Sequence, residues 1–128
     1  FKNVLRQSHY IIGILPETPE TINLIDKKTL SFFRNESVFI NVGRGSLVVE
    51  NELTSALDSG KLKGAVLDVT QVEPLPRSHP FWSHPKITIT PHISGWNVND
   101  GYNEIAQNYL KITSDQPIKN QINRNKGY

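Results

Sequence analysis

Four short apolar runs, rich in β-branched residues, constrain the fold of this chain more than any other feature of its sequence. Runs that are apolar almost throughout are typical of strands buried on both faces of a parallel sheet. Stretches with helical spacing lie between them, and we therefore predict an α/β fold built on a doubly wound parallel sheet. The predicted strands are residues 9–15, 38–42, 64–69 and 87–90.

The clearest predicted helix covers residues 50–62, where Leu53, Ala56, Leu57 and Leu62 recur near helical spacing and Gly60 supplies a stop signal. A second helix is predicted over residues 100–112. A brief amphipathic stretch covers 26–33, and the sequence Thr-Pro-Glu-Thr at 18–21 has the composition of a helix start after the first strand. Residues 74–85 are rich in proline and predict a loop.

The composition narrows the classes of function. A chain of 128 residues is long enough for one hydrophobic core, and its apolar runs are too short to span a bilayer. It contains no cysteine, which excludes disulfides and thiolate chemistry and fits a cytoplasmic location. The net charge of +2 is spread without a basic stripe, so we expect no nucleic-acid partner. The histidines at 9, 79 and 84 lack zinc-site spacing, and we expect no metal.

Several polar residues follow directly after the predicted strands. In an open parallel sheet, ligands bind beyond the carboxyl ends of the strands. A purely structural arrangement would not require polar side chains to gather at that edge. The residues that we place there are Leu15 and Pro16, Val42 to Arg44, Asp68, and Pro91 and His92.

Three of these polar residues have complementary chemistry. Arg44 lies between two glycines, where a long cation on flexible backbone could bind a carboxylate through two hydrogen bonds. A histidine beside a carboxylate, such as His92 beside Glu73, is held in one orientation and can donate a proton. Each residue alone has a plain alternative: a surface arginine in a glycine turn, a solvated loop carboxylate, a structural histidine. Their common location favours a site.

Other motifs carry less information. Asp68 has two equal interpretations, a helix cap or a cofactor contact. Gly43 and Gly45 form only part of a phosphate-binding fingerprint, and the chain contains no Gly-x-Gly-x-x-Gly sequence. The serines at positions 8, 46 and 94 lack the context of a nucleophile elbow, which gives a serine hydrolase no support.

Taken in order, five motifs closely resemble the signatures of the D-isomer-specific 2-hydroxyacid dehydrogenase family. The resemblance covers residues 9–112, and its spacing also agrees: Arg44 precedes Glu73 by 29 positions, and Glu73 precedes His92 by 19. The motifs are Leu15 to Ile25, Phe39 to Gly45, Gly64 to Val69, Glu73 to Pro76, and Thr88 to Ile93.

The resemblance implies a role for each motif residue. Arg44 would bind the carboxylate and carbonyl of a 2-oxo acid, His92 would protonate the carbonyl oxygen as hydride arrives, and Glu73 would hold and charge His92. The cofactor would be NAD or NADP, which the sequence does not distinguish. Its implied contacts are Pro16, Val42, Gly43, Asp68, His92 and Gly95, and the substrate contacts are Arg44, His92 and Ser94.

The resemblance also implies an organisation. Residues 1–98 would form the C-terminal half of a Rossmann-type NAD(P)-binding domain, and 99–128 a helix and tail that return to a substrate domain. Residues 75–82 look most similar to glyoxylate/hydroxypyruvate reductases, whereas the sequence Ser-Gly-Trp at 94–96 departs from the common family wording. Since the chain has no Met and begins at Phe1, we interpret it as a fragment. The resemblance implies a homodimeric full-length protein, and because the chain lacks the family's glycine-rich pyrophosphate loop we expect it to be inactive in isolation.

Two other functions remain open from the sequence. The chain could be a folded interaction or assembly module without catalysis, because half of a nucleotide-binding domain exposes a sheet edge and part of its core. It could also be a relative of transcriptional corepressors, a class that resembles this family and keeps the same three residues.

Overall fold

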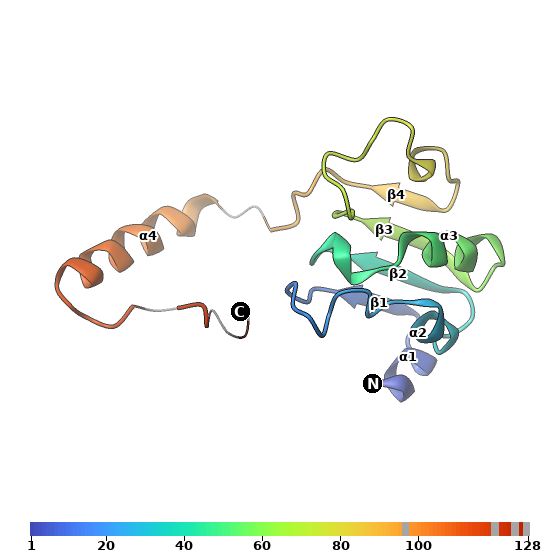
Figure 1. The fold of residues 1–128 in the computed structure, drawn as a ribbon, viewed down its shortest axis with the longest axis horizontal. Coiled ribbons are helices and arrows are strands. Elements are labelled where there is room, and N and C mark those ends of the chain that lie inside the picture. Colours follow the sequence, from blue (N-terminus) through green and yellow to red (C-terminus); the bar gives the residue numbers. More distant parts are fainter. Residues whose placement is uncertain (96–97, 119–120, 124–125, 127–128) are drawn as a thin grey trace. The chain divides into compact units, whose positions relative to one another are not determined.

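The computed structural model describes residues 1–95, 98–118, 121–123 and 126. Four strands pair side by side into a parallel sheet in chain order, β1-β2-β3-β4 (Figure 1). All three strand pairs are parallel, which confirms the predicted α/β class. The strands are β1 Tyr10–Gly13, β2 Ser37–Asn41, β3 Leu62–Leu67 and β4 Ile87–Ile89.

The helices are short except for the last. They are α1 Lys2–Gln7, α2 Lys27–Ser31, α3 Glu50–Asp58 and α4 Val98–Thr113, with 3-10 turns at Gly45–Leu47 and Pro80–Trp82. Asp26 caps α2, because its Oδ1 accepts a hydrogen bond of 2.7 Å from the backbone N–H of Thr29. Gly60 follows α3 with φ of +77°, a left-handed conformation that suits glycine, as its predicted stop signal requires.

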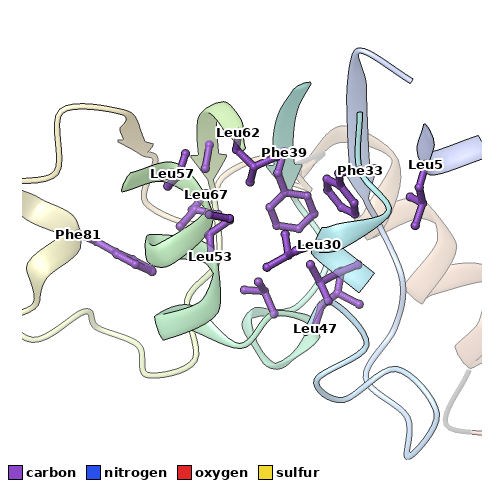
Figure 2. Close-up of a cluster of buried hydrophobic side chains, with 14 residues drawn as sticks. Leu5, Leu30, Phe33, Phe39, Leu47, Leu53, Leu57, Leu62, Leu67 and Phe81 are labelled. Atoms are coloured by element: carbon purple, nitrogen blue, oxygen red, sulfur yellow. The ribbon is translucent and has the colours of Figure 1, made fainter. Parts of the chain in front are cut away.

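The hydrophobic core lies between the sheet and the helices α2 and α3, which cover the same face (Figures 1 and 2). Leu30 of α2 and Leu53 and Leu57 of α3 pack with Phe39 of β2 and Leu67 of β3. Burying each such side chain contributes roughly 1.5–3 kcal/mol to stability. Phe81, from the 3-10 turn in the proline-rich loop, joins the same cluster and anchors that loop to the core.

The register of the strands aligns their carboxyl ends. Gly13 pairs with Asn41, Asn41 with Leu67, and Leu67 with Ile89, so these four residues form one row across the sheet. The alignment continues past the strands, because the backbone N–H of Asp68 donates to the carbonyl of Asn41 at 2.9 Å. The chain therefore leaves all four strands at one edge, which is where the sequence placed its candidate residues.

Two details of the predicted secondary structure are wrong. Residues 18–21 do not begin a helix: the carbonyl of Thr18 accepts from the N–H groups of Thr21 and Ile22, and this single turn ends at Asn23, whose φ is +57°. The predicted helix 50–62 ends at Asp58, and Leu62 belongs to β3. Gly60 separates the two elements. Leu62 matched the helical spacing because it begins a strand that packs into the same core as α3.

The chain divides after Ser94 into two compact units, residues 1–94 and 95–128. The second unit contains α4, which confirms the helix predicted over 100–112. The apolar side chains Tyr102, Ile105 and Tyr109 on this helix are exposed. No helix in the described part of the chain is long and apolar enough to cross a membrane. Trp96, part of the motif that departs from the family wording, lies outside the described residues.

Candidate active site

The turn that carries Arg44 is organised by a buried asparagine. Asn41, the last residue of β2, has no exposed surface. Its Nδ2 donates to the carbonyl of Arg44 at 2.9 Å, and its Oδ1 accepts from the N–H of Gly43 at 3.2 Å. Our sequence reasoning missed this role. The available signal was a polar residue inside an apolar strand, next to a Gly-Arg-Gly sequence, because a buried amide needs hydrogen-bond partners.

The two glycines that flank Arg44 allow close backbone packing. A Cβ at Gly45 would lie 1.9 Å from the carbonyl oxygen of Thr70, and one at Gly43 would lie 2.8 Å from the carbonyl oxygen of Leu15. Both neighbours are backbone atoms that cannot move aside cheaply. The turn is thus packed between the segments that follow β1 and β3, and the flexible turn expected from the sequence is wrong. Close backbone packing also explains why glycine occupies positions 43 and 45, which in the sequence match part of a phosphate-binding fingerprint.

The side chain of Arg44 is exposed and opens onto a cavity. Its Nη1 donates to the carbonyl of Gly43 at 2.8 Å. The cavity holds about 230 Å³ and is also lined by Glu17, Glu73 and His92. Arg44 and His92 come from turns 48 positions apart in the sequence, and the aligned strand ends bring both to this cavity.

Glu73 and His92 are joined by a hydrogen bond. Oε2 of Glu73 lies 2.7 Å from Nδ1 of His92, and Oε1 accepts from the backbone N–H of Thr70 at 3.0 Å. Burial raises the pKa of Glu73, but the hydrogen bonds from His92 and Thr70 outweigh it and hold the pKa below its ordinary value. An ionised carboxylate only accepts hydrogen bonds, so Nδ1 carries a proton and Nε2 is the nitrogen that can exchange one with a ligand.

Asp68 is the most buried acid at this edge, with 4% of its surface exposed. Its Oδ2 accepts from the N–H of Ser94 at 2.9 Å, and its Oδ1 accepts from the N–H of Ile93 at 3.1 Å and from the hydroxyl of Thr90. Burial opposes ionisation, yet the Thr90, Ser94 and Ile93 hydrogen bonds hold the pKa of Asp68 far below its usual range. Within the described residues Asp68 caps no helix. Both its oxygens bind the loop around His92.

The other predicted site residues of the first unit lie at or near the same edge. Pro16 follows β1 and its carbonyl accepts from the hydroxyl of Thr21 at 2.7 Å. The N–H of Val42 donates to the carbonyl of Gly13 at 2.9 Å, and Ser94 contacts Asp68 through its backbone. Gly95 begins the second unit. The roles of these residues toward cofactor or substrate remain predictions.

Two of the three remaining histidines, His79 and His84, have acidic partners. His79 lies 3.3 Å from Glu50, and His84 lies 3.2 Å from Asp58. Across the described ranges of the chain, no group of three potential metal ligands comes together.

A second cavity of about 270 Å³ adjoins the Glu73 and His92 pair. It is lined largely by apolar side chains, among them Leu75, Trp82 and Ile89. Our sequence reasoning did not predict this cavity, since the proline-rich residues were predicted only as a loop and local patterns do not show how such a loop folds back onto β4.

Comparison with known proteins places this architecture in a family. Residues 1–94 match the family of D-isomer specific 2-hydroxyacid dehydrogenases, in its NAD binding domain. The chain is 38% identical over 125 residues to glyoxylate/hydroxypyruvate reductase A of Klebsiella pneumoniae strain 342, a match that covers 97% of this chain and 40% of the relative. The chain thus spans well under half the length of this relative.

Solved structures agree with the sequence match. A D-isomer specific 2-hydroxyacid dehydrogenase from Xanthobacter autotrophicus Py2, in complex with NADPH and MES, superposes with a TM-score of 0.93 at 35% identity, covering 99% of this chain and 53% of that one. An NADPH-dependent glyoxylate/hydroxypyruvate reductase from Sinorhizobium meliloti, in complex with NADP and sulfate, gives 0.93 at 30% identity, covering 99% of this chain and 42% of that one. The sequence match, the parallel sheet and these superpositions agree, and the chain belongs to the D-isomer specific 2-hydroxyacid dehydrogenase family.

Proposed function

We propose that this chain carries the proton donor and the substrate-binding arginine of an NAD(P)-dependent dehydrogenase that interconverts a small 2-oxo acid and its D-2-hydroxy acid. The observation that carries the proposal is the shared cavity: Arg44, Glu73 and His92 line it together, with His92 hydrogen-bonded to Glu73. Relatives named glyoxylate/hydroxypyruvate reductase point to glyoxylate and hydroxypyruvate as the first substrates to test.

The three side chains supply what carbonyl reduction needs apart from the hydride. The guanidinium of Arg44 binds the substrate carboxylate through two parallel hydrogen bonds and draws charge from the carbonyl oxygen. His92 donates the proton on Nε2 to that oxygen as the C–H bond forms, and the alkoxide becomes a hydroxyl. Glu73 stabilises the protonated imidazole and fixes its orientation. In the oxidation direction, His92 takes the proton back.

The strand-end edge fits the nicotinamide end of a dinucleotide. The bound coenzyme would supply the hydride, and Pro16 and the backbone of Val42 would lie beside it, at the place where open parallel sheets bind ligands. Gly43 is packed against the backbone of Leu15, so it would contribute through its main chain. Asp68 would face the nicotinamide end and also hold the loop that it binds, because its Oδ2 accepts only one of the described hydrogen bonds and can accept another. Ser94 and Gly95 would border the mouth of the site.

The proposal extends to the organisation of the protein. Residues 99–128 would return to a substrate-binding domain, the full-length protein would be a homodimer, and it would act in the cytoplasm. The residues assigned here form only part of a coenzyme site, because the chain contains no glycine-rich pyrophosphate loop. We therefore expect the isolated chain to be inactive. Light scattering of the full-length protein tests the dimer directly.

A coenzyme oxidation assay tests the function. The full-length protein should oxidise NADPH or NADH when glyoxylate or hydroxypyruvate is added, with the loss of nicotinamide absorbance as the readout. The product should be a D-2-hydroxy acid wherever the substrate creates a stereocentre. Absence of turnover with both coenzymes and both substrates, for a protein that binds the coenzyme, would refute the proposal.

A second candidate function is a folded interaction module without catalysis. The observation in its favour is the exposure of large apolar side chains on the edge strand β1, including Tyr10 and Ile12. A titration of NADH followed by its fluorescence separates the two candidates. Saturable binding together with turnover would exclude the non-catalytic module.

A further inference from the structure

The backbone of His92 adopts an unfavourable conformation. Its φ is +53°, in the left-handed region, where a residue with a Cβ is disfavoured by roughly 1–2 kcal/mol. Such a conformation persists only where the surrounding structure determines it. The turn that presents His92 to Glu73 must therefore be held by contacts other than its own local preference.

Asp68 supplies these contacts from the neighbouring strand end. Its carboxylate receives hydrogen bonds from both sides of His92: the Thr90 hydroxyl before it, and the Ile93 and Ser94 N–H groups after it. Thr90 is itself tied to β3, because its N–H donates to the carbonyl of Leu67 at 3.0 Å. The N–H of His92 donates back to the carbonyl of Thr90, also at 3.0 Å, and closes the turn.

We propose that Asp68 and Thr90 are positioning residues, whose partly buried hydrogen bond fixes the left-handed turn of His92 and so places its Nδ1 against Glu73. The proposal rests on the function proposed above for His92. Neither residue needs to touch the substrate, and both act through the geometry of the proton donor. It gives Asp68 a task in addition to the cofactor contact that the family resemblance implied.

The energetics explain why Thr90 matters. A carboxylate as deeply buried as that of Asp68 is stable only when its oxygens are hydrogen-bonded, and the hydroxyl of Thr90 is one of the two described donors to Oδ1, beside the N–H of Ile93. Replacing this hydroxyl with a methyl group leaves Oδ1 short of a donor. The loop then relaxes to bring water or another donor to Asp68, and His92 loses its support.

Three variants of the full-length protein isolate this effect. Thr90→Val keeps the shape of the side chain and removes the hydroxyl, whereas Thr90→Ser keeps the hydroxyl. The matched control is Thr88→Val, on the same strand but with an exposed side chain. Thermal unfolding of each variant shows that it is folded before the geometry is measured.

The first readout does not depend on activity. A ¹³C NMR titration of the Glu73 carboxyl reports the His92 contact, because that hydrogen bond lowers the pKa of Glu73. In Thr90→Val the Glu73 pKa should rise towards its ordinary value. In Thr90→Ser and Thr88→Val it should stay where the wild type has it. An unchanged titration in folded Thr90→Val would overturn the proposal.

Kinetics provide the second readout. Thr90→Val should lower kcat at least about tenfold, because misplacing the proton donor slows the chemical step. KM for the 2-oxo acid should change less than about twofold, since Arg44 is held by a separate turn. Thr90→Ser should restore most of kcat. A wild type that shows the Glu73 shift but no turnover would refute the proposed function alone, and a normal kcat in Thr90→Val would refute the positioning role alone.

Discussion

The ends of β2 and β4 each present one side chain to the same cavity, but they hold it in different ways. Arg44 has an ordinary extended backbone, with φ of −136° and ψ of 142°, and its turn is fixed by a buried asparagine and by close packing at Gly43 and Gly45. His92 has a left-handed backbone, and its turn is fixed by the buried carboxylate of Asp68. The Arg44 turn is therefore held by close packing and by hydrogen bonds to a neutral amide, and the His92 turn by hydrogen bonds to a charged carboxylate.

The difference follows from the task proposed for each side chain. An arginine that binds a carboxylate has a long, adjustable side chain, so only its Cα must be fixed, and its guanidinium is free to follow the substrate. A proton donor must hold one ring nitrogen at hydrogen-bond distance from the reacting atom, which requires both backbone and ring to be fixed. Accordingly, the imidazole of His92 is bound to Glu73 at 2.7 Å.

The largest expected effect comes from removing the proton donor. We chose His92→Asn because asparagine tolerates the left-handed conformation, so the turn should survive. kcat should fall roughly 10²- to 10⁴-fold while KM for the 2-oxo acid changes little. Steady-state kinetics with glyoxylate measure both constants. A normal kcat in this variant would show that His92 is not the proton donor.

Next in size is the loss of close packing beside Arg44. Gly45→Ala places a Cβ 1.9 Å from the backbone oxygen of Thr70, and the free energy of unfolding should fall by about 3 kcal/mol. Urea denaturation measures this change. The matched control is Gly64→Ala in β3, whose nearest contact would be the carbonyl oxygen of Lys86 at 3.4 Å, an ordinary distance. Equal losses in both variants would show that the Arg44 turn is not held by close packing.

A smaller effect is expected from Arg44 itself. Arg44→Ala should raise KM for the 2-oxo acid roughly 10- to 100-fold, the loss expected for hydrogen bonds between charged groups, and should leave kcat closer to normal. Arg44→Lys keeps the charge but not the paired hydrogen bonds, so its KM should lie between that of the wild type and that of Arg44→Ala. If Arg44→Ala lowered kcat as severely as His92→Asn, the two turns would share one task.

The smallest effect concerns acid stability. The pKa of Glu73 is lower in the folded than in the unfolded protein, so its ionised form stabilises the fold above the unfolded value of 4.5, and this contribution is lost as the pH falls from that value through the lower pKa of the folded state. The side chain is 37% exposed, and solvent screening limits the contribution to under about 1 kcal/mol. Urea denaturation at decreasing pH should show wild type losing slightly more stability than Glu73→Gln. The exposed control Glu20→Gln should lose stability with falling pH as the wild type does. If Glu73→Gln also lost as much stability as the wild type, the contact between Glu73 and His92 would not contribute to stability.

The sequence was sufficient for the class of fold, and for recognising the three residues that share a cavity. Runs such as residues 38–42 are largely apolar on both faces, which favours a strand covered on both sides. Strand boundaries were less accurate: residues 64–69 were predicted where β3 is Leu62–Leu67, because local apolar patterns do not show where sheet pairing stops. Helix α1 was not predicted at all, since its six residues give too short a periodic signal.

The supporting residues were harder to predict, because each one acts across the fold. Asn41 supports the turn that follows its own strand, and a polar residue inside an apolar run signals a buried amide without showing which groups it binds. Asp68 was left between a helix cap and a cofactor contact, and its partners Thr90, Ile93 and Ser94 lie 22 to 26 positions away. Hydrogen bonds over such separations depend on strand register, which a local pattern does not encode.

The sequence by itself therefore determined the parallel α/β class, the family resemblance and the chemistry available in Arg44, Glu73 and His92, because residue type and order fix propensity and charge. The tertiary structure alone decided how these groups are held: the row that aligns four strand ends, the backbone contacts that require glycine at 43 and 45, and the left-handed turn at His92. Those features come from atoms that meet only after the strands pair. Their physical basis is packing and hydrogen bonding between segments that are distant in the sequence.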